Sequence, residues 1–196
     1  MATTDELLLA FQLFDAANKQ DPNTEIFDGT TYPKEMLYGI RMTERLNEFA
    51  PNASEALILT ARCQHICRWE ITRESYTMNR EGYLKWRHDL KKFHARKASS
   101  ILQEVGYNQD TIDKVCFLLE KKQLKKNDQT QTLEDVICLV FLEYYFEPFA
   151  LKHPVDKTIE ILKKTWRKMS AKGQEAALKL PLSKYVSELI FKALSQ

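Results

Sequence analysis

Apolar residues recur at helical spacing along most of this chain, with polar segments between the repeats. Leu7, Leu8, Phe11 and Phe14 form the first such stripe, which ends before Asp21. Intervals of three and four residues place side chains on one face of a helix, so each stripe predicts an amphipathic helix. The predicted helices cover residues 4–20, 33–50, 55–70, 83–105, 110–120, 133–146, 155–172 and 182–194. We therefore expect an all-α fold, a bundle of about eight helices in a single domain that spans all 196 residues.

Turn-forming and apolar segments refine this prediction. Residues 24–32 combine aromatic and turn-forming residues without a sustained period, which predicts a loop, and Pro33 suits the first turn of the next helix. The polar stretch 72–82 predicts a second loop, of the kind that covers a site. Residues 133–146 are apolar around most of the circumference, which is typical of a helix at the centre of a bundle. Gly173 is expected to end the helix before it.

Composition and charge narrow the class of protein. The chain has 44% hydrophobic and 29% charged residues with only 5 Gly and 6 Pro, as expected of a globular protein with long elements. A net charge of +2 gives no reason to expect DNA or an anionic membrane as an obligatory partner. No apolar run approaches the roughly 18 residues that span a bilayer, and Asp5 and Glu6 stand where a signal peptide is basic. We expect a cytoplasmic protein with reduced cysteines and no membrane partner.

Ionisable residues interrupt the apolar helical sequence in three places, although such groups are normally kept out of apolar faces. These residues are Arg62, His65, Arg68 and Arg73 around Trp69, then Arg87 and His94 beside Trp86, and finally Glu134 and Asp135. Their concentration on the same elements indicates a site.

Two histidines and a carboxylate on separate helices are suited to bind one divalent transition metal ion. His65, His94 and Asp135 are the predicted ligands, and Glu134 is the predicted general base. An alternative applies to each ligand. A lone inward histidine is more often a hydrogen-bonded core residue, and Thr132 with Asp135 fits a helix capping box, which the local sequence favours for Asp135.

The arginines predict an anionic small-molecule ligand, because a planar guanidinium matches carboxylate or phosphate and needs such a partner when buried. The candidate ligand-binding residues are Arg41, Arg62, Arg68, Trp69, Arg73, Trp86, Arg87 and Lys121. The alternative for any one arginine is internal pairing with acids such as Glu44, Glu55, Glu70 or Asp89. The aromatic residues at helical spacing are equally typical of a core, and the lysines near 121 are typical of a solvated helix end.

Nearly the whole chain resembles an uncharacterised family of bacterial and fungal proteins. The resemblance is carried by Phe14-Asp15-Ala16-Ala17-Asn18, Asp21-Pro22-Asn23, Arg62-x-Gln64-His65-Ile66-x-Arg68-Trp69, Tyr83-Leu84-x-Trp86-Arg87 and Leu133-Glu134-Asp135-Val136. Some fungal members carry a glutamyl-tRNA synthetase label. That activity needs alternating strands and helices and a nucleotide-binding loop, which this sequence does not predict, so we reject it.

The order and spacing of the helices also resemble the HD superfamily of all-helical, metal-dependent phosphohydrolases. His65 falls at the His-Asp pair of that family, His94 at a later histidine and Asp135 at the final aspartate. Arg41 and Lys121 stand where the family has further histidines. The resemblance therefore implies an HD-like bundle in which the two-metal centre is replaced by a one-metal or arginine-rich site.

These arguments predict a divergent HD-like hydrolase of a phosphorylated or nucleotide-like small molecule. A bound metal would lower the pKa of a water molecule, and the arginines would neutralise the developing charge. The alternative is a non-catalytic module that binds an anionic metabolite, a nucleotide or, less favoured, RNA. A third reading is a protein interaction domain whose buried charges are structural.

Overall fold

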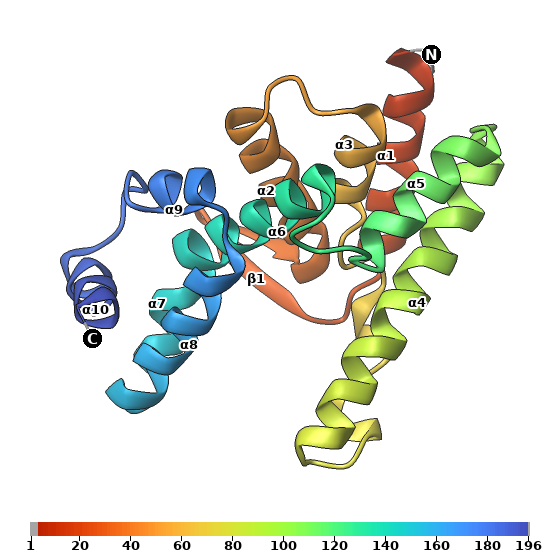
Figure 1. Cartoon of the computed structure of the whole chain (residues 1–196). Coiled ribbons are helices and arrows are strands. Elements are labelled where there is room, and N and C mark those ends of the chain that lie inside the picture. The colour runs from red at the N-terminus through yellow and green to blue at the C-terminus, as the bar shows by residue number, and fades with distance from the viewer. Residues whose placement is uncertain (1–3, 196) are drawn as a thin grey trace. The chain divides into compact units, whose positions relative to one another are not determined.

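The computed structural model describes residues 4–195, which form ten α-helices and one two-stranded sheet (Figure 1). The expected all-α class is confirmed, with more helices than the eight that periodicity predicted. The chain divides into two compact units. Unit 1 comprises Met1–Asn47 and Pro51–Lys122, and unit 2 comprises Glu48–Ala50 and Gln123–Gln196.

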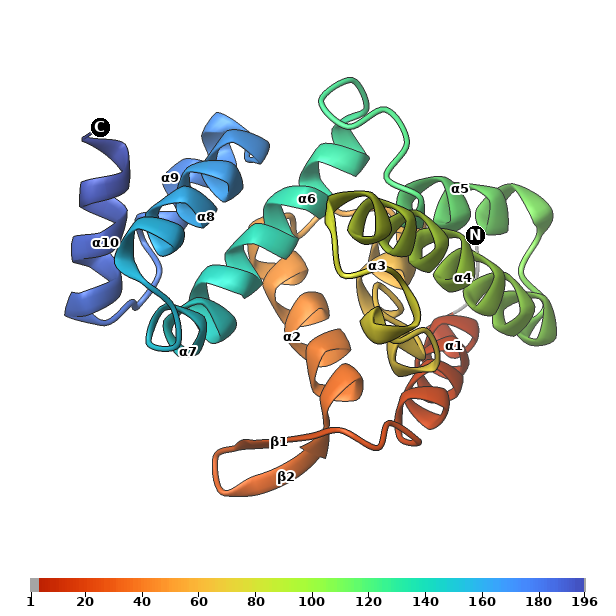
Figure 2. The same cartoon turned by 90° about the horizontal axis from the view of Figure 1, so that it is seen from below.

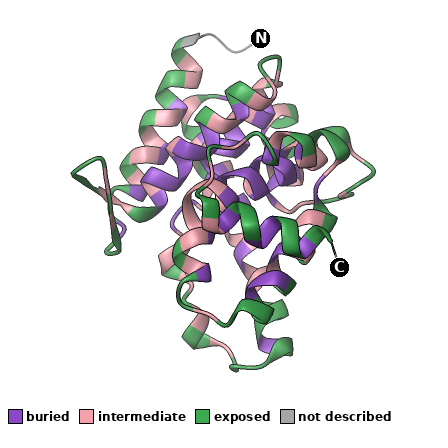
Figure 3. Cartoon of the chain, turned by 90° about the vertical axis from the view of Figure 1, so that its left-hand side faces the viewer, coloured by how far each residue is buried: buried purple, intermediate pink, exposed green. Residues whose placement is uncertain are grey.

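Unit 1 contains α1 (Thr4–Asn18), α2 (Lys34–Phe49), α3 (Glu55–Arg62), α4 (Arg80–Val105) and α5 (Gln109–Leu119). Helices α1, α3, α4 and α5 share one apolar core. Helix α4 packs along α5, and α1 and α3 pack against this pair (Figure 2). Phe14, Leu59 and Leu102 are fully buried between these helices. The buried positions lie at helical spacing, as the sequence pattern predicted, and Figure 3 shows them on the helix ribbons.

A β-hairpin occupies the segment that we expected to be a loop. Strands β1 (Thr24–Phe27) and β2 (Thr30–Pro33) pair antiparallel around Asp28 and Gly29. Both turn residues have positive φ, +47° and +73°, and an Asp-Gly pair is a strong signal for such a two-residue turn. The loop prediction is therefore wrong, and Pro33 ends β2 instead of starting α2.

The predicted helix over residues 55–70 is also wrong beyond Arg62. Helix α3 ends there, and a tight turn leads into the 3₁₀ helices η1 (Arg68–Glu70) and η2 (Arg73–Ser75). Cys67 adopts a left-handed conformation with φ +51°, which a continuous helix does not allow. This break turns the chain toward α4, so the residues that follow α3 face α2 and α4.

Unit 2 is built on α6 (Asp128–Val140), which continues through the π-helical turn η3 (Phe141–Tyr145) into α7 (Phe146–Ala150). Helices α8 (Val155–Lys168) and α9 (Ala171–Ala177) pack on α6, and α10 (Lys184–Leu194) packs on α8. The predicted single helix over residues 155–172 is divided at Ser170, which caps α9. Gly173 lies inside α9 and does not end a helix. Within the part of the chain that the structure describes, no helix has the length and apolarity needed to cross a bilayer.

Candidate functional site

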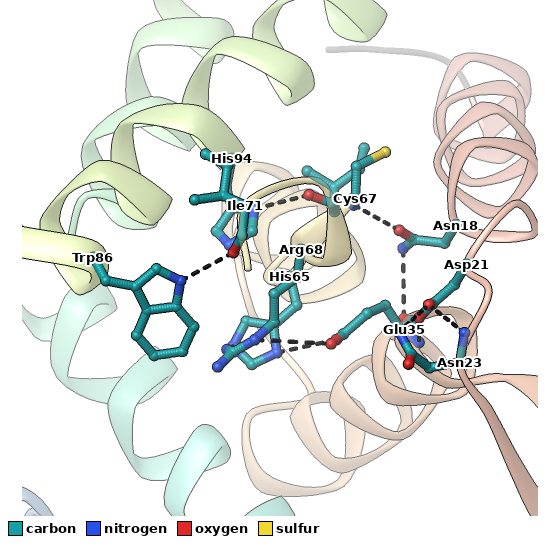
Figure 4. A network of polar contacts seen from close by, with 11 residues as sticks. Asn18, Asp21, Asn23, Glu35, His65, Cys67, Arg68, Ile71, Trp86 and His94 are labelled. Carbon is teal, nitrogen blue, oxygen red and sulfur yellow. Dashed lines mark hydrogen bonds and ion pairs between the residues drawn. The ribbon is translucent and has the colours of Figure 1, made fainter. Parts of the chain in front are cut away.

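A group of four polar side chains lies between α2, the turn after α3, and α4 in unit 1 (Figure 4). Nδ1 of His65 lies 3.2 Å from Oε2 of Glu35, and NH1 of Arg68 lies 3.1 Å from Nε2 of His65. Arg68 Nε is also 3.9 Å from the other Glu35 oxygen. His94 is the fourth member, with its ring centroid 5.9 Å from that of His65. We refer to Glu35, His65, Arg68 and His94 as the His-Arg cluster.

The side chains of Asn18, at the end of α1, and of Asp21, which follows it, bind the backbone of the segments that carry the cluster. Asn18 Oδ1 accepts a hydrogen bond from the Cys67 backbone N–H at 2.9 Å, and its Nδ2 donates to the Glu35 carbonyl at 3.5 Å. Asp21 Oδ2 accepts the Glu35 backbone N–H at 3.0 Å, which anchors the first turn of α2. One buried amide therefore links the two segments that carry Glu35 and Arg68.

Each imidazole forms a hydrogen bond with a group that can only donate or only accept, and this fixes its tautomer. A guanidinium only donates, so Nε2 of His65 accepts from Arg68, and Nδ1–H of His65 donates to Glu35. A carbonyl only accepts, so Nδ1–H of His94 donates to the Ile66 carbonyl at 2.8 Å. Nε2 of His94 is consequently an acceptor, and among residues 4–195 it has no hydrogen-bond partner although it is buried.

Aromatic rings pack around the charged groups. Tyr38 stacks on His65 with centroids 4.2 Å apart, and the Arg68 guanidinium lies 5.0 Å from the centre of the Trp86 ring. Trp86 Nε1 donates to the Ile71 carbonyl at 2.9 Å, which fixes the indole (Figure 4). Stacking on Trp86 leaves the Arg68 side chain 24% exposed. The cluster is thus packed against aromatic rings, and the Arg68 side chain is its partly exposed member.

Burial and positive charge keep both histidines neutral at physiological pH. Burial lowers the pKa of His94 to about 3, with the neighbouring His65 adding to the effect. Burial also lowers the pKa of His65, as do the charges of Arg68, Arg87, Lys121 and Lys34. The pKa of Glu35 is raised because burial outweighs the lowering influence of Arg68. The pKa of the Arg68 guanidinium is lowered by burial, and Arg87 adds to this effect by repulsion.

Among the predicted arginines, Arg41, Arg62 and Arg73 have internal partners. Arg41 forms an ion pair with Glu25 of the hairpin at 2.5 Å, and Arg62 forms a two-pronged pair with Asp15. Arg73 donates to three backbone carbonyls in the loop before α4. The pairing acids differ from those that we named from sequence. These three arginines hold the hairpin, α1 and the loop in place.

Arg87 differs from those arginines. It is half-buried on α4, one residue after Trp86, and its charge reaches both His65 and Arg68. It forms no hydrogen bond or ion pair with any residue in the described range 4–195. The structure therefore brings Arg87 to the margin of the His-Arg cluster with its charge uncompensated.

Two further candidates lie nearby. Trp69 packs against the apolar core of unit 1, which is the core alternative for an aromatic residue at helical spacing. Lys121 is half-buried with φ +55° at the end of unit 1, and its charge is one of those that lower the pKa of His65. Lys121 thus contributes to the positive potential at the cluster.

Glu134 and Asp135 belong to unit 2, where both are buried on α6. Glu134 forms an ion pair with Lys168 at 3.7 Å. Asp135 accepts hydrogen bonds from Ser170 and from Gln131 Nε2. The capping box with Thr132 is wrong, because α6 begins four residues earlier under the Asn127 cap and the Thr132 hydroxyl donates to the Asp128 carbonyl.

The metal prediction gains no support from side-chain grouping. Within residues 4–195 no three His, Cys, Asp or Glu side chains come together as a metal-binding group. A metal ion held by His65, His94 and Asp135 stays a prediction.

Glu35 is the cluster residue that the sequence argument missed. It stands at helical spacing with Tyr38 and Met42, which are both buried, so an acid occupies the apolar stripe of α2. That spacing was a signal for a buried, partnered carboxylate. Because Glu35 lies in a first helical turn, where acids are ordinarily explained by the helix dipole, the local sequence alone does not mark it as a site residue.

Comparison with known proteins identifies a family without a described activity. The model of a family described as "Domain of unknown function (DUF4202)" matches residues 9–190. No curated protein and no solved structure matches the chain.

Proposed function

The chain belongs to the DUF4202 family, and from the geometry of unit 1 we propose that it binds a phosphorylated or nucleotide-like small molecule at the His-Arg cluster. The anionic group of this ligand pairs with Arg68 and Arg87. Their guanidinium forks match the oxygens of a phosphate group.

The supporting observation is an excess of positive charge around two neutral rings. Within the described part of the chain, the charges that lower the pKa of His65 belong to Arg68, Arg87, Lys121 and Lys34. The carboxylate that faces Arg68 and His65 is Glu35, and burial raises its pKa. Half-buried guanidinium groups ordinarily pair with an acid, so an anion from solution completes this arrangement.

The route to the site is through Arg68. Its contact with Glu35 is long, at 3.9 Å, and its side chain is partly exposed, so an ion pair with an incoming anion can replace its hydrogen bond to His65. Arg87 repels Arg68 in the free protein, and a bound dianion removes that repulsion. The ligand thus gains both ion pairing and relief of repulsion.

Calorimetric titration with propyl phosphate and with adenosine 5′-monophosphate tests the proposal. Arg68→Gln and Arg87→Gln should each weaken binding by about tenfold or more, since a charge-assisted hydrogen bond is worth roughly 1.5–3 kcal/mol. Arg96→Gln removes an exposed arginine from the same helix as Arg87 and should leave the affinity unchanged. No binding to wild-type protein, or equal losses in all three variants, would overturn the proposal.

The same titration separates the small-molecule ligand from RNA. An RNA ligand that pairs with many cations loses affinity steeply as salt is added, and a single phosphate contact does not. We expect a single-stranded RNA oligonucleotide to bind no more tightly than the mononucleotide. Hydrolysis of the ligand, with a metal ion and Glu134 as general base, stays a prediction from the sequence.

A further inference from the structure

Two imidazole rings lie next to each other in the His-Arg cluster, and the proposed anion contact uses the lone pair of neither ring. The rings of His65 and His94 are inclined by 34° with centroids 5.9 Å apart (Figure 4). Nε2 of His65 is covered by Arg68, and Nε2 of His94 has no partner among residues 4–195.

Both atoms are fixed as hydrogen-bond acceptors. Glu35 and the Ile66 carbonyl hold the two Nδ1–H groups, so neither ring can turn a proton toward Nε2 without losing a buried hydrogen bond. A buried acceptor without a donor is uncommon in folded proteins, and a bound group is one recurrent explanation. Within the described chain, the cluster therefore lacks a hydrogen-bond donor for Nε2 of His94.

Arg68 couples these lone pairs to the anion contact. It donates to His65, whose ring lies beside that of His94. When the guanidinium pairs with a phosphate group it leaves Nε2 of His65 without a donor. An anion without donors would then leave two acceptors unpaired.

We infer that the ligand is a hydroxylated phosphate ester, whose hydroxyl groups donate to Nε2 of His65 and of His94 while its phosphate pairs with Arg68 and Arg87. Sugar phosphates, including the ribose phosphate part of nucleotides, belong to this class. The inference rests on the proposed anion site and adds the hydroxyl requirement. A site built to pair with a hydroxyl discriminates strongly against an analogue that lacks it, because its own polar groups remain unpaired.

Matched esters of equal charge test the inference in wild-type protein. Glycerol 3-phosphate has the carbon skeleton of propyl phosphate with two added hydroxyls, and ribose 5-phosphate extends the reach of the hydroxyl groups. We expect at least one of the hydroxylated esters to bind about tenfold more tightly than propyl phosphate in calorimetric titration. Affinities equal to that of propyl phosphate for both would overturn the inference and leave the anion site standing. Binding of none of the three esters would overturn both.

Variants of His65 and His94 test whether their Nε2 atoms cause the preference for hydroxylated esters. His65→Phe and His94→Phe keep a ring and remove the lone pair, so each should reduce severalfold the ratio between the affinity for the hydroxylated ester and the affinity for propyl phosphate. His88→Gln replaces an exposed histidine on the same helix as His94 and should keep the full preference. A preference retained in both phenylalanine variants would overturn the assignment.

Nitrogen-15 NMR of the wild-type histidines gives a readout that does not depend on the folding of any variant. Ribose 5-phosphate should shift the Nε2 signals of both His65 and His94, as expected of new hydrogen bonds. Propyl phosphate should shift the His65 signal alone, through the departure of Arg68. An unchanged His94 signal with ribose 5-phosphate would contradict the inference.

Discussion

Asp135 of α6 accepts two hydrogen bonds from Ser170, the N-cap residue of α9. Oδ1 of Asp135 accepts the Ser170 backbone N–H at 2.7 Å, and Oδ2 accepts the Ser170 hydroxyl at 2.5 Å. The Ser170 Oγ in turn accepts the Gly173 backbone N–H at 3.0 Å and caps α9. A buried carboxylate on one helix therefore organises the start of another, 35 residues later in the chain.

Removal of this carboxylate should destabilise the protein. We expect Asp135→Ala to lower the free energy of unfolding by about 2–3 kcal/mol, because two partly buried donors of Ser170 lose a charged acceptor. Urea denaturation followed by circular dichroism measures the change. Glu188→Ala, which removes an exposed acid from α10, should stay within about 0.5 kcal/mol of wild type. Equal stability of Asp135→Ala and Glu188→Ala would show that the Ser170 contacts carry no net energy.

At Gly173, the effect of an alanine substitution on stability should change sign when the Asp135 carboxyl group is removed. A Cβ at this position would lie 2.6 Å from Cγ of Asp135, so Gly173→Ala should destabilise the protein by more than about 1 kcal/mol through overpacking. In an Asp135→Ala background the obstructing carboxyl group is gone. The same Gly173→Ala change should then be neutral or stabilising by up to about 1 kcal/mol, the ordinary preference of a helix for alanine. The double-mutant cycle measures this reversal, and additive effects would contradict it.

Asn18 provides a corresponding test in unit 1. Asn18→Leu keeps the branching and the number of side-chain heavy atoms but cannot accept the buried Cys67 N–H, so it should cost roughly 1–3 kcal/mol. Gln12→Leu places the same side chain at an exposed position of α1 and serves as the control. The variant should also weaken binding of propyl phosphate, because Arg68 follows Cys67 directly. Unfolding free energies equal to those of the control would rule out this linking role.

The periodic part of the fold could be predicted from sequence, and the interruptions could not. The stripes of α1, α4 and α5 gave these helices to within a few residues, because burial repeats with the helical period. The break after Arg62 depends on an amide of Asn18 that is 49 residues from Cys67, and the start of α9 depends on Asp135. Contacts between residues so far apart in the sequence cannot be predicted from the local pattern of apolar residues.

The residues of the candidate site likewise fall into those that a local signal predicts correctly and those that it does not. His65, Arg68, Trp86, Arg87 and His94 were recognised because charge on apolar helical sequence is a local signal, and the structure brings them together. Arg41 and Arg62 carry the same local signal and pair instead with Glu25 and Asp15. Sequence alone does not separate these two groups, because the difference lies in which acid the fold places beside each arginine.

The two neutral histidines predict a specific dependence of stability on pH. In the unfolded chain His94 takes up a proton below its ordinary pKa of 6.5, whereas in the folded protein it does so only near pH 3. The unfolded state therefore binds more protons between these values, and acidification favours unfolding. His94 contributes a slope that approaches about 1.4 kcal/mol per pH unit, and His65 acts in the same direction. Glu35 opposes them, because its raised pKa makes the folded state the one that holds the extra proton, but it is one group against two.

We expect the free energy of unfolding from urea titrations to fall steadily from pH 6.5 to pH 4. His94→Gln keeps an amide donor for the Ile66 carbonyl and removes the titration, so its profile should be flatter, whereas His88→Gln should follow wild type. Parallel profiles for wild type and His94→Gln would show that His94 is protonated in the folded protein, and the acceptor role of its Nε2 would fall with that result.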